Sequence, residues 1–168
     1  MIRKCGGPDV EDIFDIINDA AQAYKGVIPE DTWHEPYMSL EDLVLEIEDG
    51  VVFWGVEQND QLTGVMGIQD RGEVSLIRHA YTRTIHRSSG IGSRLLRFLE
   101  QTTEKTILVG TWADANWAIL FYRKNGFKLT SEKRKNQLLR RYWHISERQI
   151  EASVVLEKRA GQNRNTSS

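Results

Sequence analysis

Cysteine and proline are scarce in this sequence, with one and three copies among 168 residues. The single cysteine, Cys5, cannot pair within the chain, which excludes an internal disulfide framework and a metal site built from cysteines. A reducing compartment fits best. The net charge is only −2, so the basic excess typical of nucleic-acid binding is missing. Residues 1–14 lack the apolar stretch of a signal peptide, and no apolar run approaches the roughly 18 residues of a membrane helix. We therefore expect a cytoplasmic protein that binds neither nucleic acid nor a membrane.

The composition that remains is typical of a globular protein. Hydrophobic residues make up 40% of the chain and charged residues 27%, which argues against disorder over the whole length. The length suits one domain with a substantial core and is short for two. We predict a single domain over residues 1–158 and a disordered polar tail over residues 159–168.

Periodicity in the first half of the chain predicts two helices followed by three strands. Apolar residues recur at spacings of three and four between Pro8 and Gly26, which is the pattern of one apolar helix face. Ser39 is a suitable N-cap for a second, short helix. Three runs rich in β-branched and aromatic residues follow, and the short turns between them favour an antiparallel meander. The predicted helices cover residues 10–24 and 40–48, and the predicted strands cover residues 51–57, 62–69 and 74–82.

The second half alternates between helical and strand patterns. The predicted helices cover residues 90–104, 116–124 and 132–143, and the predicted strands cover residues 106–111, 127–129 and 149–157. A strand–helix–strand sequence requires a crossover and therefore some parallel pairing. Together with the meander, this predicts a mixed α/β domain in which helices cover both faces of one sheet.

The turn between the third predicted strand and the next helix is rich in small residues. Its sequence is Arg87-Ser88-Ser89-Gly90-Ile91-Gly92-Ser93. Small residues let a ligand approach the backbone, and the first amides of a helix lack partners within the helix. With the helix dipole, these amides suit a phosphate. The turn lacks the lysine of a Walker loop, and Leu95 stands where a dinucleotide fingerprint has its third glycine. A plain tight turn remains the alternative.

A second segment gives the first one a more specific meaning. Residues 115–127 read ANWAILFYRKNGF, and together the two segments resemble the GNAT superfamily of N-acetyltransferases. The family's first motif, R/Q-x-x-G-x-G/A, is matched by Arg87, Gly90 and Gly92. The second motif, N-x-x-A-x-x-F-Y-x-x-x-G-F, is matched at Ala118, Phe121, Tyr122, Gly126 and Phe127. Asn116 stands one residue closer to the alanine than the usual asparagine. The segment is also similar to a bacterial GNAT subgroup of unassigned substrate.

The resemblance, which extends over about residues 10–129, implies the GNAT fold. That fold is a mixed, mostly antiparallel sheet of about six to seven strands, with helices on both faces and a V-shaped splay between strands 4 and 5. In this family, pantetheine lies in the splay and pairs with the backbone of a bulged fourth strand. The implied contacts with the coenzyme are at Ala80, Tyr81, Thr82, Arg87, Ser88, Ser89, Gly90, Ile91, Gly92, Ser93 and Asn116.

The resemblance also implies an activity. Acetyl-CoA is the implied co-substrate, with no metal, and the acetyl group passes to a primary amine of a small molecule or peptide by direct attack in a ternary complex. Tyr122 matches the family's general acid, although it could instead only pack beside Phe121. An amide near Ala80 would polarise the thioester carbonyl. Glu73 and His79 are candidates for a general base, with a solvated turn residue and a partly buried histidine as the plainer interpretations.

Other features leave alternatives open. Trp33, His34 and Tyr37 could form the wall of the acceptor site or merely hold their loop to the domain. The basic helix over residues 132–143 could reach the coenzyme or be a solvated face. A coenzyme A-binding regulatory or sensor module is an alternative function, although the presence of Tyr122 argues against it. A small-molecule or nucleotide binder that uses the glycine turn alone is a third. A homodimer would be in keeping with the family.

Overall fold

A computed structural model describes residues 1–159 of the chain. Its centre is a seven-stranded sheet with the order β1-β2-β3-β4-β5-β7-β6. Only β4 and β5 pair in parallel, and all other neighbours are antiparallel. The strands are β1 Ile2–Lys4, β2 Val52–Gln58, β3 Gln61–Asp70, β4 Val74–Thr82, β5 Thr106–Trp112, β6 Lys128–Leu129 and β7 Ser153–Lys158. The predicted mixed and mostly antiparallel sheet is therefore confirmed.

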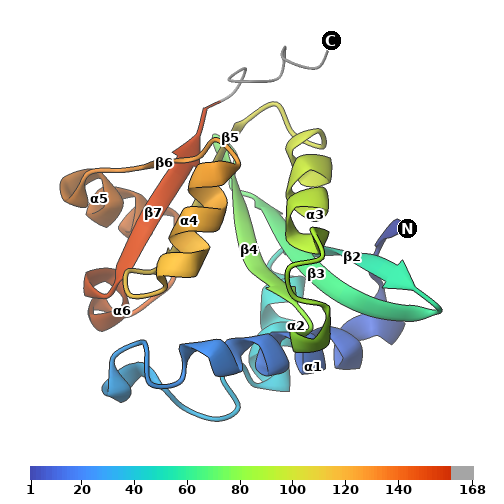
Figure 1. The fold of residues 1–168 in the computed structure, drawn as a ribbon. Helices are drawn as coiled ribbons and strands as arrows, with labels where there is room; N and C mark the ends of the chain where they lie inside the picture. The colour runs from blue at the N-terminus through green and yellow to red at the C-terminus, as the bar shows by residue number, and fades with distance from the viewer. Residues whose placement is uncertain (160–168) are drawn as a thin grey trace.

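Helices cover both faces of this sheet, as predicted (Figure 1). They are α1 Val10–Ala21, α2 Leu40–Glu48, α3 Ile91–Glu100, α4 Asn116–Lys124, α5 Glu132–Tyr142 and α6 Glu147–Glu151. In β4, Ile77 belongs to the core beneath α3, whereas the preceding Leu76 packs beneath α5. Val65 and Met66 divide in the same way between α1 and α3. Because successive side chains of a strand point to opposite faces, α1, α2 and α5 lie opposite α3 and α4.

The connection between β2 and β3 is a tight hairpin of the predicted kind. Asn59 and Asp60 form the turn between the paired residues Gln58 and Gln61, and both turn residues have positive φ, 52° and 63°. Two central residues with positive φ match the twist of the flanking strands, and Asn and Asp tolerate that region better than most residues.

The parallel strands β4 and β5 separate part-way along their length. They pair only from Val74 with Thr106 to Ile77 with Val109, although β4 continues to Thr82. In Figure 1 the two strands lie together at one end, and β4 then runs away from β5 toward α1. A bulge also interrupts the pairing of β4 with β3, because Met66 alone faces the two residues His79 and Ala80. The implied splay and bulge are thus both present.

Two elements differ from the sequence prediction. The strand β1 was not predicted, because three residues are too few to show alternation. The predicted strand over residues 149–157 is in part a helix, α6, and β7 begins only at Ser153. Ser146 and Gln149 form a reciprocal capping box that starts this helix. The prediction of a disordered tail falls on residues 159–168, of which 160–168 lie outside the described residues. Within residues 1–159, no helix is long and apolar enough to cross a membrane.

Candidate active site

A large cavity opens where β4 separates from β5. Its volume is about 710 Å³, and its wall is formed by the end of β4, the following loop and the facing sides of α3 and α4. With the exception of Asn116, every residue expected to contact the coenzyme lines this cavity, namely Ala80, Tyr81, Thr82, Arg87, Ser88, Ser89, Gly90, Ile91, Gly92 and Ser93. The fold therefore brings the strand edge and the glycine turn to one site.

The backbone of the glycine turn presents a row of unpaired donors. Within the described residues, none of the amides of residues 88–93 donates a hydrogen bond, and the first helical bond of α3 runs from the amide of Arg94 to the carbonyl of Gly90. Ser88 and Gly90 both adopt positive φ, 62° and 80°, which opens the turn. Free amides at the start of a ten-residue helix favour an anion. Arg87 and Lys124 line the same cavity and add positive charge.

Tyr122 projects from α4 into the wall of this cavity. The side chain is 5% exposed and is held edge-on between Phe121 and Phe127, at centroid distances of 5.0 and 5.6 Å. Its hydroxyl has no hydrogen-bond partner among the described residues. Burial raises the pKa of Tyr122 above its usual value. The phenol therefore keeps its proton at neutral pH, and its O–H group can donate a hydrogen bond or a proton.

The helices α3 and α4 meet closely beside Tyr122. A Cβ atom on Gly92 would lie 3.2 Å from the ring of Phe121. The side-chain amide of Asn125 donates to the carbonyl of Phe121 at 2.9 Å and reaches the hydroxyl of Ser93 at 3.5 Å. The contact between Asn125 and Ser93 links the start of α3 to the end of α4, so that the free amides and Tyr122 lie in the wall of the same cavity.

The structure does not bring Asn116 into the cavity. This residue begins α4 but is exposed and lies outside the cavity wall. The one-residue shift of Asn116 within its motif was the signal of this displacement. Trp117 lines the cavity instead and stacks on Tyr24 at 5.8 Å. Sequence reasoning missed both Trp117 and Lys124, because each looks like an ordinary residue on the exposed side of a helix.

A second, smaller pocket adjoins the cavity on the opposite side of the β4 edge. Its volume is about 150 Å³, and Tyr24 and Tyr81 line both hollows. His79 faces the small pocket, whereas the next residue, Ala80, faces the large cavity. Tyr37 also lines the pocket, and Trp33 and His34 stack on its ring at 6.0 and 6.4 Å. The loop that carries Trp33, His34 and Tyr37 therefore contributes Tyr37 to the pocket wall, and the stacking of these three rings holds the loop in its conformation.

The two candidate bases lie far apart. Glu73 immediately precedes β4, at the strand's opposite end from the splay, where its carboxylate accepts hydrogen bonds from Arg141 at 2.9 Å and from the Tyr142 hydroxyl at 3.0 Å. It lines neither hollow. His79 lies at the bulge and lines the small pocket. Of the two, only His79 is placed near the splay.

The basic side chains of α5 pair with other groups of the fold and do not line the large cavity. Arg134, Arg140 and Arg141 form ion pairs with acidic residues of the same region. Lys135 is buried, and its ammonium donates to the carbonyl of Ile150 at 2.8 Å. None of the basic residues of α5 lines the large cavity, so the expected contact of this helix with the coenzyme has no support in the geometry.

Comparisons with known proteins agree with this architecture. Residues 49–129 match the sequence profile of the family described as acetyltransferase (GNAT) domain. The fold is similar to that of the PaiA N-acetyltransferase of Thermoplasma acidophilum in complex with coenzyme A, with a TM-score of 0.70, 20% identity and coverage of 95% of this chain and 98% of that one. It is also similar to the ribosomal-protein-S18-alanine N-acetyltransferase of Escherichia coli, with a TM-score of 0.67, 15% identity and 97% coverage of both chains.

A third similar structure is that of YncA, a putative acetyltransferase of Salmonella typhimurium with acetyl-CoA, with a TM-score of 0.62, 19% identity and coverage of 78% of this chain and 80% of that one. Curated protein sequences give no match. The mixed sheet, its splay and the cavity define an acyltransferase fold of the GNAT type. Residues 49–129, nearly half of the chain, match the GNAT acetyltransferase domain family, and the whole described domain has the GNAT fold.

Proposed function

We propose that the protein transfers an acetyl group from acetyl-CoA to a primary amine, which it binds in the small pocket. The observation that carries this proposal is the row of free amides at residues 88–93, which faces a cavity large enough for the phosphates and pantetheine arm of the coenzyme. The structures from Thermoplasma acidophilum and Salmonella typhimurium, which contain coenzyme A and acetyl-CoA, support this choice of ligand.

The residues present fit acetyl-CoA at three points. The amides of residues 88–93, with Arg87 and Lys124 nearby, would hold the pyrophosphate. The edge of β4 at Ala80 and Thr82 has lost its pairing with β5 and would offer backbone groups to the pantetheine amides. The amide of Ala80 would then polarise the thioester carbonyl.

Three tyrosines lie where the reaction would take place. Tyr24 and Tyr81 border both hollows, so an amine in the small pocket would meet the thioester at this border. Tyr122 would donate its phenolic proton to the departing sulfur. Holding both substrates in one complex supplies the proximity that direct attack requires.

Titration calorimetry and a thiol-release assay test this function. Acetyl-CoA and coenzyme A are expected to bind, whereas ATP, which lacks the pantetheine arm, is expected to bind much more weakly. Purified protein with acetyl-CoA and a panel of primary amines is expected to release free thiol. Tight binding of ATP without binding of acetyl-CoA would contradict the proposal, and coenzyme binding without any thiol release would favour a sensor over an enzyme.

A further inference from the structure

His79 has a backbone conformation that few residues of its kind adopt. Its φ is +56°, in the left-handed region, at the point where β4 bulges away from β3. For a residue with a Cβ the left-handed region is unfavourable, and such strain is concentrated at functional sites. Here the bulge turns the imidazole into the small pocket while Ala80 lines the coenzyme cavity.

The imidazole is held on one side only. Its Nε2 contacts a carboxylate oxygen of Glu46, which comes from α2, and the ring stacks between Phe53 and Tyr81 at 6.1 and 6.4 Å. Its Nδ1 has no hydrogen-bond partner among the described residues and is not a buried unsatisfied atom. A carboxylate that accepts from Nε2–H leaves the lone pair of a neutral imidazole on Nδ1. The free nitrogen therefore has the form of a base.

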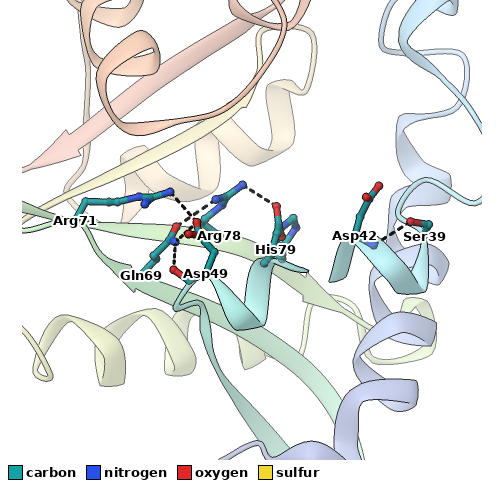
Figure 2. Close-up of polar contacts among 8 residues, drawn as sticks. Ser39, Asp42, Asp49, Gln69, Arg71, Arg78 and His79 are labelled. Carbon is teal, nitrogen blue, oxygen red and sulfur yellow. Dashed lines mark hydrogen bonds and ion pairs between the residues drawn. The ribbon is translucent and has the colours of Figure 1, made fainter. Parts of the chain in front are cut away.

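Glu46 is itself well anchored. Its other carboxylate oxygen accepts a hydrogen bond from the Arg78 guanidinium at 2.8 Å. Arg78 also donates to the side chain of Gln69, which in turn donates to the carboxylate of Asp49 (Figure 2). Burial acts to raise the pKa of Glu46, but the hydrogen bond from His79 and the positive charge nearby, including that of the Arg78 guanidinium, outweigh it, so that the pKa lies below its usual value. The carboxylate is thus ionised at neutral pH and can stabilise an added proton on the imidazole.

Apart from the Arg78 guanidinium, the other titratable groups around His79 carry no charge that would oppose protonation of the imidazole. Tyr24, Tyr37 and Tyr81 line the same pocket, and burial raises the pKa of each phenol, so all three are neutral. The charges next to the imidazole are those of Glu46 and Arg78, which balance each other. A proton that arrives on Nδ1 gives the imidazole a positive charge. The ionised Glu46 carboxylate, which contacts Nε2 of the same ring, then stabilises this charge.

We propose that His79, positioned by Glu46, is the general base that accepts a proton from the acceptor ammonium. This proposal rests on the proposed function. The ammonium R–NH3⁺ gives one proton to Nδ1, and the neutral nitrogen then forms a bond to the thioester carbonyl carbon. The carbon–sulfur bond breaks, and the second nitrogen proton reaches the thiolate by way of Tyr122. The products are the N-acetyl amine, free coenzyme A thiol and one proton, which the imidazolium releases to water.

The tautomer of His79 tests this assignment without any substrate. In ¹⁵N-histidine-labelled protein at pH 8, long-range proton–nitrogen spectra are expected to show His79 protonated at Nε2 and bare at Nδ1. In Glu46→Gln the signals are expected to shift toward a mixture of the two tautomers. A proton on Nδ1 in the wild type would overturn the proposal, because the lone pair would then face Glu46 rather than the pocket.

Kinetics with two matched amines test the role of the base. His79→Asn removes the imidazole, and asparagine tolerates the left-handed backbone. At pH 7 its kcat is expected to fall about 100-fold with phenethylamine, which must lose a proton, and far less with β,β-difluorophenethylamine, which is largely neutral already. Glu46→Gln is expected to lower kcat for phenethylamine but to add nothing to His79→Asn in the double variant. Equal losses for both amines would overturn the base assignment, whereas a wild type that binds no acetyl-CoA would refute the proposed function instead.

A separate observation limits what the pocket can accept. Five aromatic side chains line its wall, with the ring centroids of Tyr24 and Tyr37 5.3 Å apart and the indole of Trp112 donating to the Tyr37 hydroxyl at 2.8 Å. The one arginine in the wall, Arg78, is already paired with Glu46, and the wall contains no lysine. Ring faces attract an ammonium, but a carboxylate in this pocket would find no free cation.

The geometry points to an acceptor amine on an aromatic or alkyl chain without an adjacent carboxylate. The pocket volume of about 150 Å³ suits the end of a slender molecule. Matched pairs test this class, namely phenethylamine with phenylalanine, tyramine with tyrosine, and cadaverine with lysine. We expect kcat/KM to be at least about tenfold higher for the member without the carboxylate in at least one pair, since an unpaired buried charge is costly. In Glu46→Gln, which frees Arg78, the ratio is expected to shift toward the amino acid. Equal or greater activity with the amino acids, or no activity with any of the three amines, would overturn this class.

Discussion

Replacement of Tyr122 by phenylalanine is expected to lower kcat by about 100-fold or more and to leave the Kd for acetyl-CoA nearly unchanged. The substitution removes only the hydroxyl, which has no partner within the described residues, and keeps the ring between Phe121 and Phe127. A thiolate that departs without a proton donor is a poorer leaving group, so the loss falls on the chemical step rather than on binding.

Thiol release and calorimetry with the same protein separate these two quantities. Tyr142→Phe is a matched control, because the Tyr142 hydroxyl donates a hydrogen bond to Glu73, and Tyr142 lines neither the large cavity nor the small pocket. This control should keep kcat within about twofold, since a solvent-accessible hydrogen bond contributes little. Equal turnover of Tyr122→Phe and the wild type would remove Tyr122 from the chemistry and leave it a packing role.

The second large effect is expected at Gly92. Valine at this position is expected to weaken binding of acetyl-CoA by about 10- to 100-fold, because overpacking a close contact costs about 1–3 kcal/mol. A single Cβ would already lie 3.2 Å from the Phe121 ring, so the larger side chain would displace α3, Phe121 or both at the wall of the coenzyme cavity. Gly90 differs, since a Cβ there meets nothing within 4 Å, and its φ of +80° is what demands glycine.

Calorimetric titration of Gly92→Val, with thermal unfolding as a check of the fold, measures this effect. The double variant Gly92→Val, Phe121→Ala makes room for the added methyl groups and is expected to regain part of the affinity. Unchanged affinity in a folded Gly92→Val protein would show that the start of α3 does not face the coenzyme. A double variant weaker than either single one would argue against a steric cause.

The parts of the fold that the sequence predicts well are those with a strong local cause. The hairpin at Asn59 and Asp60 and the helix cap at Ser39 follow from the conformations that these residue types favour. The cavity proposed for the coenzyme is lined by a glycine turn and a helix motif that are each continuous in the chain. Local spacing is enough to place these residues, because the backbone between them is regular.

The parts that sequence reasoning missed depend on contacts between distant segments. Glu46 lies 33 positions before His79, and nothing in the helical pattern of α2 indicates that its carboxylate meets an imidazole. The start of β7 was misplaced because the Ser146 capping box competes with the β-branched run that follows it. Asn116 was assigned by motif resemblance, but a shift of one residue on a helix rotates a side chain by about 100°, and here it leaves the cavity.

The central claim is that the free amides of residues 88–93 hold the pyrophosphate of the coenzyme in the splay between β4 and β5. A crystal structure of the complex with coenzyme A tests it most directly. The account predicts phosphate oxygens within about 2.7–3.2 Å of several of these nitrogens, and the pantetheine arm along Ala80 with its sulfur beside Tyr122. Coenzyme bound on another surface, with these amides still facing only solvent, would contradict it.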